Sequence, residues 1–104
     1  MTRDEILRME PGRELDALVA RKLFGVLNPD PLWRPSEDIS AALEVTERFK
    51  DIRITRYVDP EMKMWKCEIQ NFGVRYLALE KTMAAAICKA ALLAVMDGED
   101  KHGR

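Results

Sequence analysis

The feature that most constrains the fold is the long apolar segment over residues 82–97, TMAAAICKAALLAVMD. Lys89 is the only charged residue between its two ends. Ala, Leu and Met favour a helix, which Thr82 can cap and the Asp97-Gly98 pair can end. Large side chains would lie on every side of this helix, as is typical of a helix buried inside a domain. Because the segment is shorter than the roughly 20 residues that cross a bilayer, it predicts a core helix.

Length and composition predict a single domain that needs neither metal nor disulfide support. The chain has 104 residues, of which 47% are hydrophobic, enough for a core at this size. Its 17 basic and 18 acidic residues give a formal net charge of −1, which argues against a dedicated nucleic-acid or membrane-surface binder. Cys67 and Cys88 stand in apolar surroundings, as reduced core thiols do. The first residues show no secretory signal pattern, so we expect a cytoplasmic protein.

Three shorter helices are predicted ahead of the buried one. Thr2 and Glu5 have the spacing of a capping box, so a short helix should follow to about residue 9. Pro11 and Gly25 mark the start and the end of a second helix with one apolar face. A proline-rich loop follows, and a third helix should begin from a cap at residue 36 or 38.

Residues 51–80 predict three antiparallel strands. A turn at residues 59–62 places Ile54 opposite Cys67 in the first hairpin. A three-residue loop, with Gly73 in the left-handed conformation, should close the second hairpin.

The predicted fold class is therefore α+β, in the order of three helices, a three-stranded meander and a long helix. We expect a single domain over residues 1–97. The polar residues 98–104 should form a disordered tail.

The predicted register divides the sheet between a core face and a second face. The core face should carry Ile52, Ile54, Val58, Trp65, Cys67, Ile69, Leu77 and Leu79. The second face should carry Arg53, Thr55, Tyr57, Met64, Lys66, Glu68, Val74, Tyr76 and Ala78. This mixture is too apolar for a bare sheet, so we expect the N-terminal segment or a second subunit to cover it. Six of its residues form a candidate interaction face: Arg53, Tyr57, Met64, Lys66, Glu68 and Tyr76.

Three blocks of the sequence resemble the phage ABA-sandwich domain, a family of small phage and prophage proteins from bacteria with no assigned biochemical function. The blocks are MTRDEILRMEPGRELDALVARKLFG at the start, SEDISAALEVTERF in the middle and AAICKAALLAVMD near the end. They span most of the chain in the family's order. The segment between Gly25 and Ser36 is short for the family, and Met83-Ala84 stands where Ala-Pro is common. The resemblance implies an α/β/α sandwich and a phage or prophage origin, and it brings no catalytic residues.

No catalytic, metal-binding or cofactor-binding motif emerges from the residue pattern. His102 is the only histidine, no base is evident for either cysteine, and the glycines form no phosphate-binding loop. We therefore predict no enzyme, no cofactor and no metal site. The predicted function is a non-enzymatic protein-interaction domain in the bacterial host, with an unknown protein or a second copy of itself as the partner.

Two other function classes stay open. A helix, three strands and a helix are also the order of the double-stranded-RNA-binding domain, whose last helix begins with phosphate-binding lysines. Met83, Ala84 and Ile87 stand at the matching positions of this chain. Only Lys81 and Lys89 are basic nearby, so nucleic-acid binding is the alternative and not the first choice. An enzyme of unknown class comes third.

Overall fold

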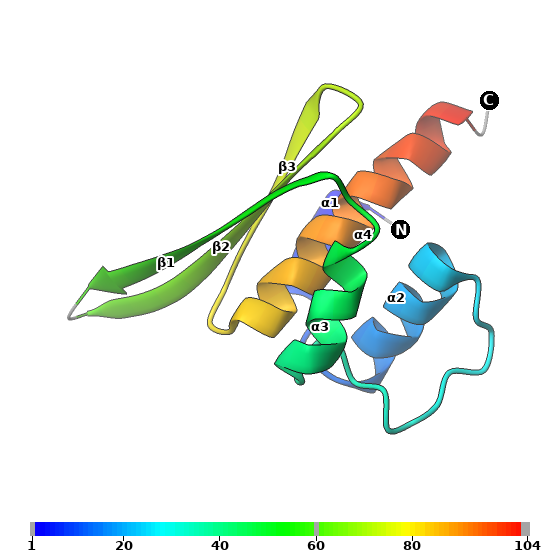
Figure 1. Cartoon of the computed structure of the whole chain (residues 1–104), viewed down its shortest axis with the longest axis horizontal. Coiled ribbons are helices and arrows are strands. Elements are labelled where there is room, and N and C mark those ends of the chain that lie inside the picture. Colours follow the sequence, from blue (N-terminus) through cyan, green and yellow to red (C-terminus); the bar gives the residue numbers. More distant parts are fainter. Residues whose placement is uncertain (1, 60, 103–104) are drawn as a thin grey trace.

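The computed structural model describes residues 2–59 and 61–102, in which four helices lie on one side of a three-stranded antiparallel sheet (Figure 1). The elements in chain order are α1 (Arg3–Arg8), α2 (Arg13–Phe24), α3 (Ile39–Thr46), β1 (Asp51–Asp59), β2 (Met62–Asn71), β3 (Val74–Glu80) and α4 (Met83–His102). The strands lie in the order β1-β2-β3. The predicted α+β class and the predicted order of elements are both confirmed.

Helix α4 lies at the centre of the molecule, between the sheet and the other helices (Figure 1). It packs against β2 and β3 on one side and against α2 and α3 elsewhere on its surface. Residues 84–94 are all buried, as predicted for a helix that is apolar nearly all round. Its many alanines let the neighbouring elements approach the helix backbone closely.

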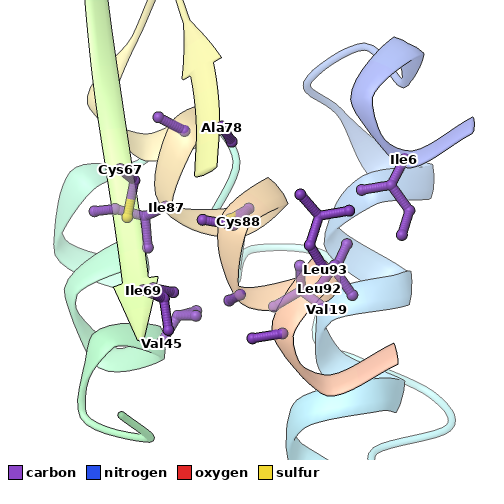
Figure 2. Packing of buried hydrophobic residues seen from close by; sticks show 14 of the residues in the cluster. Ile6, Val19, Val45, Cys67, Ile69, Ala78, Ile87, Cys88, Leu92 and Leu93 are labelled. Carbon is purple, nitrogen blue, oxygen red and sulfur yellow. The ribbon is translucent and has the colours of Figure 1, made fainter. Parts of the chain in front are cut away.

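The core fills the space on two sides of α4 (Figure 2). On the sheet side, Ile87 of α4 lies beside Cys67 of β2. On the helix side, Leu92 of α4 lies near Val19 of α2, and Ile6 of α1 closes that part of the core. Because one helix contributes to both parts, the sheet and the helices share a single hydrophobic core.

The predicted caps set most of the helix boundaries. The N–H of Glu5 donates to Thr2 Oγ1 and the N–H of Thr2 donates to Glu5 Oε1, both at 3.2 Å, so the capping box is confirmed. Gly25 ends α2 in the left-handed conformation with φ 67°. Asp38, and not Ser36, caps α3, since its carboxylate accepts the N–H of Ser40.

Helix α4 is longer than the sequence predicted. It continues to His102, whereas the sequence predicted an end at the Asp97-Gly98 pair. A glycine inside a helix costs about 1 kcal/mol and does not by itself end a helix that is well packed upstream. Residues 98–102, which were assigned to a disordered tail, are therefore helical. Residues 103–104 lie outside the described part, and the domain boundary at residue 97 stays a prediction.

The register of the first hairpin is confirmed, and that of the second is shifted by one residue. Ile54 lies opposite Cys67 as predicted. The second turn has two residues instead of three, because Asn71 pairs with Val74 and both Phe72 and Gly73 have positive φ. A shift of one residue turns every side chain of a strand to the other face.

The shifted register changes which side chains of β3 face α4. Tyr76 and Ala78 lie opposite Ile69 and Cys67 and therefore belong to the core face. Leu77 and Leu79, predicted for the core, belong to the opposite face. Ala78 is 1% exposed, and its small side chain lets α4 pack closely against the sheet. The close packing of α4 against Ala78 thus stabilises the observed register more than burial of Leu77 and Leu79 would stabilise the predicted one.

The N-terminal segment does not cover the second face of the sheet. Helix α1 packs on α4, on the same side of the sheet as the other helices (Figure 1). Its Ile6 is only 1% exposed and belongs to the common core. The expectation of an N-terminal cover is therefore wrong, because α4 had room for α1 on its own surface.

Candidate functional site

The side of the sheet turned away from α4, here called the outer face, brings together most of the predicted interaction residues. Side chains directly opposite each other in an antiparallel pair point to the same side. By this rule the outer face contains Arg53, Thr55, Tyr57, Met64, Lys66, Glu68, Leu77 and Leu79. Five of the six residues predicted for the interaction face are among them.

Large apolar side chains of the outer face are open to solvent. Tyr57 is 43% exposed, Leu77 37% and Leu79 53%. No helix in the described part of the chain packs over them (Figure 1). Sequence reasoning missed the two leucines because it assigned them to the core. The two-residue turn at Phe72 and Gly73 was the signal that could have placed them correctly.

Two of the cations on the outer face contact neighbouring side chains. The Nε atom of Arg75, which also lies on this face, is 3.6 Å from Oε2 of Glu68. The ammonium group of Lys66 lies 5.7 Å from the ring centre of Tyr57, a cation–π geometry. The pair with Glu68 therefore reduces the positive charge that this face offers to a phosphate backbone.

Tyr76 is the predicted interaction residue that the structure places elsewhere. It lies on the core face, and its hydroxyl donates to Oδ2 of Asp97 in α4. Burial, reinforced by the hydrogen bond to Asp97, raises the pKa of Tyr76 to about 12. Its hydroxyl therefore stays protonated at neutral pH and ties the sheet to α4.

Lys89, one of the two lysines considered for phosphate binding, is buried. Its ammonium group pairs with Oε1 of Glu80 and donates to the carbonyl oxygen of Leu7 at 2.9 Å. The side chain is only 3% exposed, so its charge serves to join α1, β3 and α4. Lys81, just before α4, is exposed, but residues 83–90 of α4 add no second exposed lysine to it.

Both cysteines are buried core thiols. Cys67 and Cys88 are completely inaccessible, and both belong to the core around α4 (Figure 2). Burial raises the pKa of Cys67 to about 12 and raises the pKa of Cys88 as well. A protonated, inaccessible thiol is a poor nucleophile, so neither residue has the chemistry of a catalytic cysteine.

Asp16 of α2, a buried acidic residue, has a structural role. Its Oδ1 accepts the N–H of Ser36 at 2.7 Å, and the Ser36 hydroxyl oxygen accepts the N–H of Gly12 at 2.9 Å. These contacts hold the loop before α3 against the start of α2. They give a physical role to Asp16, which lies in the first of the three family-like sequence blocks.

Neither a metal cluster nor a membrane-spanning helix emerges within residues 2–59 and 61–102. No group of three or more histidine, cysteine or acidic side chains gathers there in a metal-binding arrangement. None of the helices described is both long and apolar enough to cross a membrane.

Comparisons with known proteins found a matching family model and a similar solved structure. The model of the phage ABA sandwich domain matches residues 17–92. The structure is similar to the crystal structure of a phage protein from Bacillus cereus ATCC 14579, with a TM-score of 0.69 and 28% sequence identity. That similarity covers 85% of this chain and 89% of the other. None of the curated proteins compared with the chain matches it.

Proposed function

The chain belongs to the phage ABA sandwich domain family, and from that premise we propose that it is a non-enzymatic protein-interaction domain of a phage or prophage. The observation that carries the proposal is the outer face of the sheet, where Tyr57, Leu77 and Leu79 are exposed together. Tyr57 lies on β1 and the two leucines lie on β3, with β2 between them, so a single sheet holds these side chains in a fixed arrangement. Apolar side chains that gather on an open face are typical of protein–protein contact surfaces.

The mixed polarity of the outer face also favours a protein partner. Lys66 and Glu68 of β2 lie between the exposed apolar residues of β1 and β3, and Arg53 of β1 lies opposite Glu68. A protein interface commonly combines apolar contacts with a small number of charged groups that fix orientation. We propose that the partner is a phage or host protein in the bacterial cytoplasm, with a second copy of the chain as the other candidate.

Nucleic-acid binding has less support. The buried, paired Lys89 cannot contact a phosphate without leaving the core, and the formal net charge of the chain is −1. Binding to a nucleic-acid backbone depends on several free cations that neutralise phosphates. A gel shift with duplex RNA and duplex DNA at low and moderate salt tests this alternative directly.

The test of the interaction proposal compares charge insertion on the outer face with charge insertion elsewhere. The test variant carries Tyr57→Glu and Leu79→Glu. The control carries Leu27→Glu and Leu32→Glu, two leucines that are 77% and 80% exposed outside the sheet. Circular dichroism first establishes that both variants are folded.

The readout is quantitative mass spectrometry of proteins cross-linked to each tagged chain in bacterial cells that carry the induced phage. We expect one or a few proteins to be enriched by the natural chain and by the control, and to be lost with the outer-face variant. Light scattering on the purified chains reports self-association in the same set. Equal recovery of the same proteins by all three chains, together with a monomeric natural chain, would contradict the proposal.

A further inference from the structure

We propose that the free edge of β3 is a second binding site, which accepts an extended peptide segment of a partner protein as a fourth strand. The segment places one apolar side chain in a pocket beside the edge and a carboxylate at the pocket rim. The pocket shares Arg75 and Leu77 with the outer face, so the variants below separate the two surfaces at Tyr57, which does not line the pocket.

The pocket lies along the edge of a strand that has only one neighbour. In the strand order β1-β2-β3 of the described sheet, β3 is an edge strand. Four consecutive β3 residues, 74–77, line a pocket of about 250 Å³. Successive side chains of a strand point to opposite faces, so a pocket that touches all four lies at the strand edge and not on one face. Edge strands present backbone N–H and C=O groups that can pair with an added strand.

The inner wall of the pocket is apolar. It is formed by Ile6 of α1 and by Leu93 and Met96 of α4, each of them buried in the core. The volume lies below the roughly 300–1,000 Å³ of pockets that enclose whole small-molecule ligands. The pocket therefore suits a single aliphatic side chain better than it suits a cofactor.

The polar groups around the pocket favour an acidic residue next to the anchor. Arg3 of α1 and Arg75 of β3 both line it, and the Arg75 side chain is 64% exposed. Asp97, the acidic residue of the pocket lining, accepts the hydroxyl of Tyr76. An arginine forms strong, directional hydrogen bonds with a carboxylate. The preferred segment is thus an extended one in which apolar and acidic residues alternate.

The test uses a defined peptide and a ¹⁵N-labelled chain in solution. The probe is the acetylated and amidated heptapeptide Thr-Val-Glu-Leu-Glu-Val-Thr. We expect amide chemical-shift changes centred on residues 74–77 during titration. Replacing the central leucine of the peptide by serine, or methylating its backbone nitrogens at alternate residues, should weaken binding about fivefold or more, because one removes the anchor and the other the strand hydrogen bonds.

Matched variants of the chain separate this site from the outer face. Arg75→Glu should weaken binding of the peptide about tenfold, since it replaces a favourable charge contact by a repulsive one. Arg21→Glu, at an exposed position of α2, should leave binding unchanged. Tyr57→Ser, on the outer face, should also leave it unchanged.

Three results would overturn the proposal. One is the absence of shift changes at residues 74–77 with millimolar peptide. Another is binding that persists undiminished with the N-methylated peptide. The third is a dimer in light scattering that Arg75→Glu dissociates, since the occupant of the edge is then a second copy of the chain.

Discussion

Replacing Leu92 by alanine tests the central position of α4. Leu92 is completely buried on the helix side of α4, in the same cluster as Val19 and Ile6 (Figure 2). The substitution removes three carbon atoms, worth about 2.4 kcal/mol at roughly 0.8 kcal/mol for each buried methylene. Strands and helices fix α4 on several sides, so the surroundings cannot collapse onto the cavity, and a further 1–2 kcal/mol or so is expected. We predict a loss of about 3–5 kcal/mol in the free energy of unfolding.

Urea unfolding followed by circular dichroism measures this loss, and a thermal scan should show a midpoint lower by roughly 15 °C or more. The matched control is Leu27→Ala, at a position that is 77% exposed, which should change the free energy of unfolding by less than about 0.5 kcal/mol. A loss below about 1 kcal/mol for Leu92→Ala would show that this side of α4 is open or loosely packed. The common core described above would then be wrong.

Three further substitutions probe the sheet and its contacts with the helices. Glu80→Ala should lower the free energy of unfolding by about 2–3 kcal/mol in a urea titration, because it leaves Lys89 buried with the Leu7 carbonyl as its remaining partner. Tyr76→Phe should remove a pH dependence of the free energy of unfolding, because the pKa of the Tyr76 hydroxyl is about 12 in the folded chain and 10.0 in an ordinary tyrosine. The free energy of unfolding should therefore fall, relative to the variant, as the pH rises from about 10 to 12. Phe72→Asn should raise the thermal midpoint, with a gain of about 0.5–1 kcal/mol, since Phe72 has φ 52° and is 93% exposed. An unchanged or lower midpoint would show that the phenyl ring contributes packing.

The features that the sequence predicted well are those set by local patterns. The capping box, the left-handed Gly25 and the apolar α4 depend on neighbouring residues, and each is confirmed. The register of β1 with β2 is also confirmed, because apolar residues alternate strongly in both strands.

The register of β3 could not be read from its own pattern. Its sequence, VRYLALE, has apolar residues on both faces, so alternation permits either orientation. The observed orientation of β3 makes two contacts with α4: the small Ala78 allows close approach, and the Tyr76 hydroxyl donates to Asp97. Both depend on a helix that follows later in the chain. For this reason Tyr76 was assigned to the interaction face, and Leu77 and Leu79 were missed.

The pairing of Lys89 with Glu80 was also beyond sequence reasoning. The two residues belong to different elements, and nothing in the apolar pattern of α4 indicates which charge would meet its lysine. The pocket at the edge of β3 could not be predicted from the sequence either, since its walls come from α1, β3 and α4 together.

The measurement that tests the interaction surface most directly is the reactivity of single thiols placed along β3. Cys67 and Cys88 are inaccessible, so an added thiol can be read alone in the folded chain. With a bulky disulfide reagent in dilute native buffer, Leu77→Cys and Leu79→Cys should be labelled at once. Ala78→Cys, at a position that is 1% exposed, should be labelled only as the chain unfolds. Fast labelling at position 78 with protection at 77 and 79 would place β3 one residue out of register, and the apolar outer face would not exist.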